Sequence, residues 1–344
     1  MNISNILGAR KSKKTENLIK PVDDKMFIDS ENTQMETVEI TETPSIEVNS
    51  VCANDLDIKK CSATNNMVNP TTLVSEDKEE PANISKPRKI VKVCKAGFEH
   101  NRCNVNNQDF VFSFMNLKAV SDGCGSGKHS EIGSQLFGQL FAREVSRFID
   151  CVNKKNTVQL FKYVKDGNIQ KFSEHLSKGE IPEEAFLGIV NVVFERMLSI
   201  CSETAFVFEN YCFTILVCLE YEEEFVVYSC GDGFIIKENS EGIMFDKLDD
   251  GEYPAYYVYN WIEPASLKDY KEGVAFKVSR YSKADYSNVG VASDGLRFFD
   301  ELYEPEKYKF WENLSIGKGP QIEMLITRNN KKDRTFKDDI SICF

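Results

Sequence analysis

The sequence is poor in histidine, the side chain on which most zinc enzymes depend. It has three histidines in 344 residues, His100, His129 and His175. They are too few and too widely spaced for a zinc hydrolase or a histidine-rich dinuclear phosphatase. The 11 cysteines are odd in number and include no C-x-x-C pair. This pattern excludes a structural zinc site and a disulfide framework, and it indicates reduced thiols in a cytoplasmic protein.

Long apolar runs and an excess of basic residues are also missing. No run approaches the ~18 residues of a transmembrane helix, and residues 1–14 lack the apolar centre of a signal peptide. The formal net charge is −12, whereas nucleic-acid-binding proteins carry a basic face and peripheral membrane proteins a basic amphipathic helix. We therefore expect a soluble protein that binds neither nucleic acid nor membranes.

Residues 1–90 almost completely lack aromatic side chains. Phe27 is their only aromatic residue and Gly8 their only glycine, while residues 91–344 contain all the other aromatic residues of the chain. A segment with a single aromatic residue cannot bury enough apolar surface to offset the entropy of folding. The sequence therefore predicts a disordered acidic and polar arm over residues 1–90 and one folded domain over residues 91–344.

Two long helices are predicted in the first half of the domain. One spans about residues 130–152, with Ser130 as its N-cap. The other, residues 182–201, begins with a proline and two glutamates and is apolar nearly all round its middle, which is typical of a helix buried between layers. Residues 157–178 between them predict a weaker helical pair. The predicted inner face of the first helix consists of Ile132, Leu136, Leu140 and Val145.

Most of the remaining folded sequence predicts strands. Residues 110–114 and 117–121 alternate between the two faces of a sheet and predict a hairpin. Strands grouped around long helices indicate an α+β fold, a layered α/β-β/α sandwich of two mainly antiparallel sheets flanked by helices. Further strands are expected over residues 212–220, 224–230, 234–237, 273–279, 288–293 and 340–344, and short helices at about 296–303 and 320–328.

Three of five Asp-Gly dipeptides directly follow apolar, strand-like segments. Asp122, Asp232 and Asp294 each end such a segment, so each carboxylate is expected at the end of a buried strand. Asp166-Gly167 and Asp250-Gly251 follow polar stretches and are interpreted as tight turns. Aspartates that several strands deliver to one sheet edge form an oxygen-rich pocket that suits Mg²⁺ or Mn²⁺.

Motifs for other kinds of phosphate chemistry are absent. No cysteine is followed six positions later by arginine, as in thiol phosphatases, and there is no G-x-S-x-G elbow. Residues 123–128 look like a P-loop, but Asp122 stands where its first glycine is required and His129 follows the lysine in place of Ser or Thr. The sequence offers carboxylates for metal binding and no nucleophile motif.

Several short segments, in order along the chain, resemble the motifs of the metal-dependent type 2C (PPM) serine/threonine protein phosphatases, and most closely the bacterial branch of that family. The resemblance spans residues 92–344 and implies the family's fold and activity. The segments are Asn107-Gln108-Asp109, residues 119–126 with residues 130–134, residues 213–217 with Gly231-Asp232-Gly233, residues 292–296, which resemble the family's SDGL, and residues 338–341, which resemble its closing DNxT.

The resemblance implies roles for particular residues. Asp122 would bridge two metal ions, and the Gly123 carbonyl would bind one of them. Asp294 and Asp338 would complete the other, and Asp109 would hold the second metal, directly or through water. In the family, a metal-bridging hydroxide attacks phosphorus in line, and the metals lower the pKa of the water and neutralise charge.

The sequence departs from the family pattern at three positions. Gln108 stands where eukaryotic members often have a glutamate. Cys124 stands where they have a histidine proposed as the general acid, and Asn104 where they have a phosphate-binding arginine. Arg102 and His100 lie nearby in the sequence and are candidates for binding the phosphate; the alternatives are a surface arginine and a helix-cap histidine.

We therefore expect a phosphoserine/phosphothreonine protein phosphatase with two Mn²⁺ or Mg²⁺ ions per domain. Asp232 is either a ligand of a third metal, as in some members of the family, or part of a structural turn. The expected partners are a phosphorylated protein substrate and the Ser/Thr kinase that makes it. The alternatives are a weak or inactive member that acts as a phosphoprotein-binding scaffold, and a small-molecule phosphoesterase. The aspartates favour the enzyme, and the missing histidine and arginine favour the scaffold.

Overall fold

The computed structural model describes residues 89–125, 127–165, 167–248, 254–262 and 273–344. The predicted arm, residues 1–90, lies outside these residues except for Lys89 and Ile90. The turns predicted at Asp166 and Asp250 also lie outside the described residues.

Ten strands of the described chain form two five-stranded sheets, in which every neighbouring pair is antiparallel. The hairpin predicted over residues 110–121 is confirmed. The first sheet contains, in spatial order, β2 (Asp109–Phe114), β3 (Leu117–Gly123), β4 (Phe213–Glu220), β5 (Glu224–Cys230) and β8 (Lys277–Ser282). The second contains β1 (Lys92–Lys95), β10 (Ile340–Cys343), β9 (Asn288–Ala292), β6 (Gly233–Asn239) and β7 (Gly242–Leu248).

The central strands are apolar on both faces because each sheet is covered on both sides. In β4, Ile215 and Val217 belong to the core under the helices, whereas Leu216 and Cys218 belong to the core between the sheets. Successive side chains of a strand point to opposite faces, so a strand covered on both sides has no polar alternation. This explains why residues 212–220 could be recognised as a strand.

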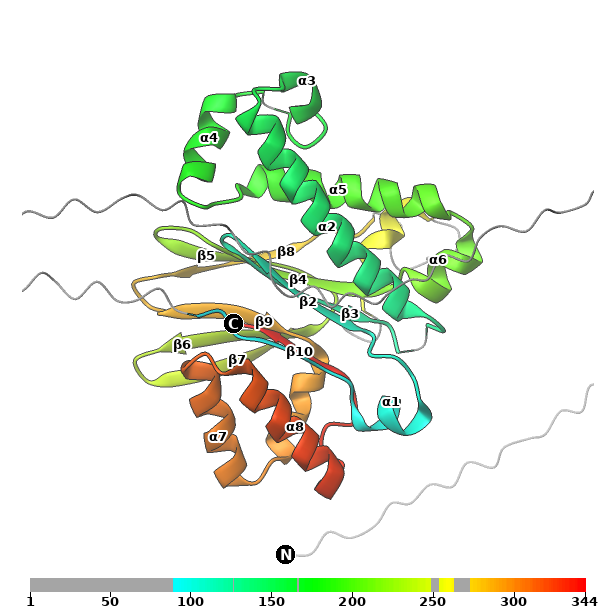
Figure 1. The fold of residues 1–344 in the computed structure, drawn as a ribbon, viewed down its shortest axis with the longest axis vertical. Helices are drawn as coiled ribbons and strands as arrows, with labels where there is room; N and C mark the ends of the chain where they lie inside the picture. Colours follow the sequence, from blue (N-terminus) through cyan, green and yellow to red (C-terminus); the bar gives the residue numbers. More distant parts are fainter. Residues whose placement is uncertain (1–88, 126, 166, 249–253, 263–272) are drawn as a thin grey trace, which may run out of the picture. The chain divides into compact units, whose positions relative to one another are not determined.

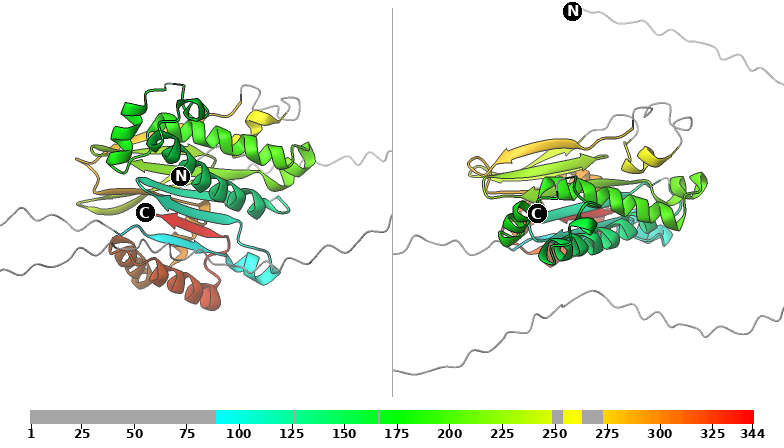
Figure 2. Two further views of the ribbon diagram at one scale, coloured as in Figure 1. Left: turned by 45° about the horizontal axis from the view of Figure 1, so that its top comes forward. Right: turned by 90° about the horizontal axis from the view of Figure 1, so that it is seen from above.

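Helices cover the outer face of each sheet, so that four layers follow one another in the order α, β, β, α (Figures 1 and 2). The predicted layered sandwich is confirmed. Helices α2 (Ser130–Asn153), α3 (Thr157–Leu160), α4 (Ile169–Ser177), α5 (Glu183–Ile200) and α6 (Thr204–Asn210) lie on the first sheet. Helices α7 (Glu304–Ser315) and α8 (Gly319–Asp333) lie on the second. Three short helices complete the described chain: α1 (Phe98–Cys103) and the 3-10 helices η1 (Tyr257–Trp261) and η3 (Asp294–Glu301).

The face that helix α2 turns to the core overlaps the predicted face but is centred on aromatic residues beside it. Ile132, at the start of the predicted face, is 44% exposed. The ring of Phe137 lies 5.3 Å from that of Phe213 on β4, and the ring of Phe141 lies 6.0 Å from that of Phe186 on α5. Large rings fill the space between helix and sheet and therefore set the rotation of the helix. Of the predicted face, Val145 is buried, and Leu136 and Leu140 are partly buried.

The predicted cap of α2 is also wrong. His129 occupies the N-cap position without a side-chain cap bond, and Ser130 is the first helical residue. The Ser130 hydroxyl donates instead to the Cys124 carbonyl at 2.9 Å. This hydrogen bond closes the loop after β3. Because it joins the helix to that loop, the helix sequence alone does not predict it.

The structure also differs from the prediction at elements that have one polar face. Helix α5 has an outer face, on which Leu187 is 37% exposed, so it is not buried all round. The strand expected at residues 273–279 begins later, as β8, and the helix expected at 296–303 is the 3-10 helix η3. Strand β7 and helix α7 were not predicted, because an edge strand and an outer helix carry many charged residues.

A chain that begins at Lys86 is expected to keep the stability of the full-length protein. Residues 1–85 contain a single aromatic residue, Phe27, and a polar arm of this composition adds no core of its own. The thermal midpoint and the hydrolysis of an aryl phosphate should therefore be unchanged by the truncation. A fall of many degrees would show that the arm contributes to the folded domain.

Candidate active site

Paired aspartates of β2 and β3 form one side of the candidate site. The strand register places Asp109 directly opposite Asp122, and the charge of Asp109 acts on the Asp122 carboxyl and adds to the rise in its pKa. Oδ2 of the buried Asp109 accepts a hydrogen bond from Ser293 Oγ at 2.8 Å. Its other oxygen, Oδ1, is buried without a hydrogen bond from an N–H or hydroxyl group of the described chain. Such an oxygen is suited to a cation or a shared proton.

Gly123 makes the tight turn after Asp122 possible. Its N–H donates to the Gln108 carbonyl at 3.1 Å. A Cβ at this position would lie 2.7 Å from Ser130 Oγ and 2.9 Å from the Gln108 carbonyl oxygen. The residue after Asp122 therefore has to be glycine for the start of α2 to pack against the end of β3.

Two aspartates come from the second sheet. Asp294 is the first residue of η3, directly after β9, and Asp338 lies two residues before β10. The two segments approach closely at Gly295, where a Cβ would lie only 1.8 Å from the Asp339 carbonyl oxygen. A glycine is thus required where the chain passes from Asp294 into η3.

Ser293 ties the two sheets together at this end. Its hydroxyl donates to Asp109 on β2, and its oxygen accepts from the N–H of Ser341 on β10 at 2.9 Å. The N–H of Ser293 donates to the Ser341 carbonyl at 2.9 Å. One serine therefore fixes the end of β9 to both β10 and the aspartate pair of the first sheet.

Asp232 lies in the connection from β5 of the first sheet to β6 of the second. Its neighbours Gly231 and Gly233 have φ angles of +97° and +138°, which only glycine adopts without strain. The position is a tight turn, and its carboxylate is also close enough to Asp294 to raise the pKa of that residue. Both interpretations of Asp232, turn and third-metal ligand, are compatible with this placement.

The aspartates repel one another in the absence of a cation. Burial raises the pKa of Asp122 well above its usual range, and the charge of Asp109 adds to the shift. Burial likewise raises the pKa of Asp109 and that of Asp294, which also feels the charges of Asp338 and Asp232. Desolvation and like charge both disfavour ionised carboxylates. A positive charge at this end of the two sheets would therefore stabilise the ionised form.

The metal-free protein is expected to lose stability as the pH rises from 5 to 8. An aspartate titrates near 3.9 in the unfolded chain, whereas burial raises the pKa of Asp109 to about 7. The protonated form is favoured by folding, so its contribution is complete below pH 4 and is lost as the pH passes the folded value. Urea denaturation in EDTA should show a fall of roughly 1–3 kcal/mol in the free energy of unfolding.

The matched control for this measurement is the double variant Asp109→Asn, Asp122→Asn. It keeps the shape of both side chains but removes the two titrating groups. Its stability should fall less between pH 5 and 8 than that of the unmodified protein. Equal pH dependence in both proteins would show that the buried pair does not titrate in this range.

Asp339 is a buried residue whose role was not predicted. Its Oδ1 accepts from the Gly97 N–H at 2.7 Å, and its Oδ2 accepts from the Gln108 N–H at 2.6 Å. His100 Nδ1 lies 2.8 Å from Asp339 Oδ1. His100, predicted as a candidate for binding phosphate, therefore contacts the carboxylate that holds α1 and β2 in place.

The two arginines nearest the predicted motifs have different surroundings. Arg102, the other candidate for binding phosphate, is exposed on α1, and its guanidinium pairs with Glu99. Arg297, which was not predicted, pairs through Nη1 with Asp294 and through Nη2 with Asp338 Oδ2 at 2.9 Å. Among the described residues, no three His, Cys, Asp or Glu side chains converge as a ready-made metal site.

The donor set nevertheless fits Mg²⁺ or Mn²⁺. These hard cations prefer carboxylate and carbonyl oxygens, and the chain gathers such oxygens from Asp109, Asp122, Asp294 and Asp338. The buried Oδ1 of Asp109 lacks an N–H or hydroxyl partner in the described chain. Burial raises the pKa of Asp122, and the neighbouring carboxylates add to the shift, so a cation beside these groups would offset the cost of ionising them.

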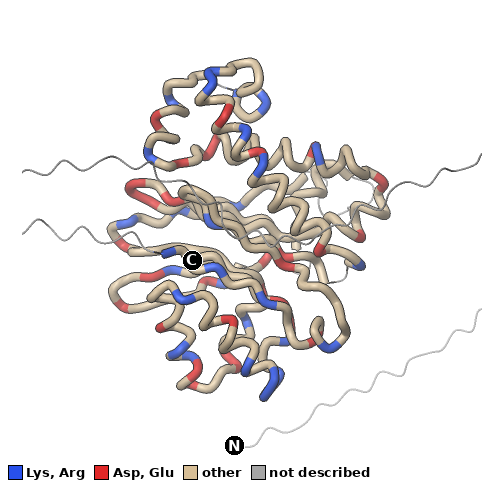
Figure 3. The backbone as a smooth tube through the Cα atoms, viewed as in Figure 1, with Lys and Arg blue, Asp and Glu red and all other residues tan. Residues whose placement is uncertain are grey.

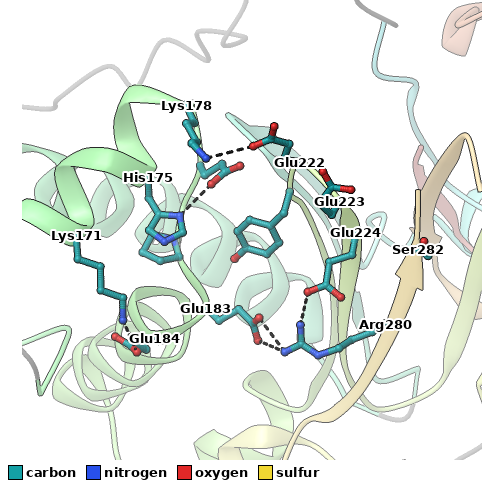
Figure 4. Close-up of a pocket in the computed structure, with 13 residues that line it drawn as sticks. Lys171, His175, Lys178, Glu183, Glu184, Glu222, Glu223, Glu224, Arg280 and Ser282 are labelled. Carbon is teal, nitrogen blue, oxygen red and sulfur yellow. Dashed lines mark hydrogen bonds and ion pairs between the residues drawn. The ribbon is translucent and has the colours of Figure 1, made fainter. Parts of the chain in front are cut away.

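A pocket of about 750 Å³ lies elsewhere, at the hairpin between β4 and β5. Its basic side chains already pair with carboxylates, as Figure 4 shows: Arg280 with Glu183 and Glu224, and Lys178 with Glu222. The hairpin connects the ends of β4 and β5 opposite to the end where Asp232 follows β5. This pocket therefore does not contain the predicted site residues.

The charged residues of the described chain are mixed over its surface. Lys and Arg positions alternate with Asp and Glu positions along the outer helices and loops (Figure 3). Among the described helices, none has the length and apolar character needed to cross a membrane.

Comparison with known proteins places the chain in a family. Residues 96–318, more than half of the chain, match the family model of protein phosphatase 2C. The segment around Asp338 lies beyond the matched range. No curated protein matches the sequence.

Solved structures with similar folds share little sequence with this chain. A bacterial serine phosphatase is 15% identical with a TM-score of 0.44, over 75% of this chain and 96% of that one. The serine/threonine phosphatase Stp1 from Staphylococcus aureus is 14% identical with a TM-score of 0.43, over 77% and 97%. The catalytic domain of the phosphatase PstP, in complex with 2 manganese ions, is 13% identical with a TM-score of 0.42, over 74% and 96%. The match over residues 96–318 shows that the chain belongs to the protein phosphatase 2C family.

Proposed function

We propose that this protein is a Mn²⁺- or Mg²⁺-dependent protein serine/threonine phosphatase. The observation that carries the proposal is the gathering of aspartates from both sheets at one end of the sandwich. Asp109 and Asp122 face each other across β2 and β3, and Asp294 and Asp338 reach the same cluster from the second sheet. Membership of the protein phosphatase 2C family supports the same activity.

The proposed metal ligands are Asp109, Asp122, the Gly123 carbonyl, Asp294 and Asp338, with Asp232 as a candidate for a third ion. When bound, the ions would lower the pKa of water and neutralise charge on the phosphoryl group. Two ions per domain are part of the proposal, by resemblance to the family.

The chain's own residues position these ligands. Ser293 holds Asp109 Oδ2 in place, and Asp339 fixes the backbone N–H of Gln108, next to Asp109. Thr214 Oγ1 accepts from the N–H of Asp122 at 3.2 Å. The ligands are thereby held by strand ends and not by long loops, so that little ordering is needed when the site is filled.

The proposed substrate is a phosphorylated protein, and a Ser/Thr kinase that makes this substrate is the proposed partner. None of the nine described cysteines forms a disulfide with another described residue, which supports a reducing compartment, and we propose a cytoplasmic location.

A phosphoprotein-binding scaffold without catalysis is the second candidate function. The ion pairs of Arg297 with Asp294 and Asp338 favour it, because a guanidinium that stays there would keep a metal ion away from these carboxylates. The position of the family's phosphate-binding arginine is held by Asn104, which also favours it.

One assay separates the two functions. The full-length protein is incubated with an aryl phosphate and with a phosphoserine peptide, in Mn²⁺ and then in excess chelator. Hydrolysis that depends on Mn²⁺ supports the enzyme. Binding of the phosphopeptide without hydrolysis at any Mn²⁺ concentration would support the scaffold and contradict the proposed activity.

A further inference from the structure

One arginine bridges two aspartates of the site. Arg297 lies on η3, three residues after Asp294, and its Nη1 pairs with Asp294 Oδ2. Its Nη2 lies 2.9 Å from Asp338 Oδ2, just before β10. A single guanidinium therefore contacts one carboxylate oxygen from each of two separate segments next to strands of the second sheet.

These contacts engage one oxygen of each carboxylate, Asp294 Oδ2 and Asp338 Oδ2. The lone pairs of Asp294 Oδ2 and Asp338 Oδ2 that accept the N–H groups cannot also be given fully to a metal ion. A guanidinium and a divalent cation are also both positive, and like charges a few ångströms apart disfavour each other. Arginine and metal are thus alternatives at this pair.

The side chain of Arg297 is able to leave. It is 47% exposed, so that movement outward does not open the core. Its guanidinium already lies over the ring of Phe298, with its central carbon 4.8 Å from the ring centroid. An aromatic face attracts a guanidinium, and this contact gives the side chain a second partner beside the carboxylates.

It also matters that the side chain paired with the two carboxylates is an arginine. An arginine stays charged at every pH at which proteins are folded and presents two parallel N–H donors to carboxylates. It therefore leaves Asp294 and Asp338 only by moving, and not by losing a proton. Displacement of the side chain must accompany metal binding to both carboxylates.

We propose that Arg297 is an internal counter-ion of the Asp294–Asp338 pair and that a divalent cation binds this pair only by displacing it. The inference rests on the proposed function, because it takes Asp294 and Asp338 as metal ligands. Arg297 thereby lowers the metal affinity of this part of the site and stabilises the metal-free protein.

The test is Mn²⁺ binding to full-length Arg297→Gln, followed through the electron paramagnetic resonance signal of free Mn²⁺. Glutamine keeps polarity and removes the charge. One opposite charge a few ångströms from a carboxylate typically changes its affinity for a proton by about tenfold or more. We expect Mn²⁺ to bind roughly tenfold more tightly to Arg297→Gln by the same electrostatic effect.

The matched control is Arg328→Gln. Arg328 is also an exposed arginine in an ion pair, with its Nη2 2.6 Å from Glu306 Oε2 between α8 and α7. Its replacement should leave Mn²⁺ affinity unchanged. Arg297→Lys keeps the charge but loses the two-pronged contact, and its affinity should fall between those of the unmodified protein and Arg297→Gln.

Thermal denaturation supplies a second readout that does not depend on activity. Metal-free Arg297→Gln should melt below the unmodified protein, because its carboxylates lose their counter-ion. Its thermal midpoint should rise more than that of the unmodified protein when Mn²⁺ is added. Together these shifts show an exchange of one cation for another.

Each result has one meaning. Tighter binding to Arg297→Gln, or binding to that variant alone, supports the inference. Equal or weaker binding overturns it while leaving the proposed function intact, since the unmodified protein still binds Mn²⁺. Absence of Mn²⁺ binding in the unmodified protein and in both Arg297 variants overturns the inference and the proposed function together.

Discussion

Replacing Asp122 by asparagine is expected to reduce Mn²⁺-dependent phosphatase activity by roughly a hundredfold or more. Asp122 is the proposed shared ligand of two ions and lies between Asp109 and Asp294. Metal ions supply several kcal/mol of transition-state stabilisation, and each 1.36 kcal/mol corresponds to about tenfold in rate. The measurement is kcat/KM for an aryl phosphate at saturating Mn²⁺.

The fold of Asp122→Asn should survive. Asparagine has the same shape, and it removes an acidic group whose pKa is raised by burial and by the neighbouring carboxylates. The thermal midpoint of the variant in EDTA, at about neutral pH, should be equal to or above that of the unmodified protein. Asp150→Asn, an exposed aspartate on α2 paired with Lys154, is the matched control and should keep full activity. Activity that survives Asp122→Asn would exclude the proposed mechanism.

Gly295→Ala is expected to destabilise the protein by about 3 kcal/mol or more. A Cβ at this position would lie 1.8 Å from the Asp339 carbonyl oxygen and 2.8 Å from its carbonyl carbon. Both are backbone atoms, so that β10 and the start of η3 would have to separate. The thermal midpoint should fall by about 6–12 °C, and Mn²⁺-dependent activity should fall with it because Asp294 and Asp338 move apart.

The control for Gly295→Ala is Gly125→Ala. Gly125 lies in the exposed loop after β3, and a Cβ there would meet no atom within 4 Å. The same addition of one methyl group should therefore leave the thermal midpoint nearly unchanged. If both variants melt at the same temperature as the unmodified protein, the close approach at Gly295 does not constrain the site.

The aspartates of the site could be located from the sequence because strand ends are a local signal. Asp122, Asp232 and Asp294 each follow an apolar run, and two sheets packed face to face bring such ends together. The register that pairs Asp109 with Asp122 confirms the predicted hairpin. Their roles as metal ligands stay a prediction that the experiments above test.

Arg297 and Asp339 could not be located in this way, because their roles depend on contacts between distant segments. Arg297 reaches across 41 residues of sequence to Asp338. Asp339 accepts from the N–H of Gln108, 231 residues away. An arginine three residues after an aspartate has many possible partners, and only the close approach of η3 and β10 selects this one.

In the fold, too, features set by local sequence were predicted and features set by contacts between distant segments were not. Strands buried on both faces, such as β4, were predicted because their sequences are apolar throughout. The buried face of α2 was predicted only in part, because the positions of Phe213 and Phe186 on other elements decide which residues of the helix lie at its centre. Strand β7, at the edge of its sheet, gave too weak a pattern to be recognised.

We propose that one end of the sandwich binds divalent cations through its aspartates. Crystals of the full-length protein grown with Mn²⁺, measured at an X-ray energy above the manganese edge, test it most directly. We predict anomalous peaks within coordination distance of Asp122, with Asp294 and Asp338 beside one of them and the Arg297 side chain turned away. Crystals that contain Mn²⁺ but show no peak among these aspartates, with Arg297 still paired to them, would contradict the claim.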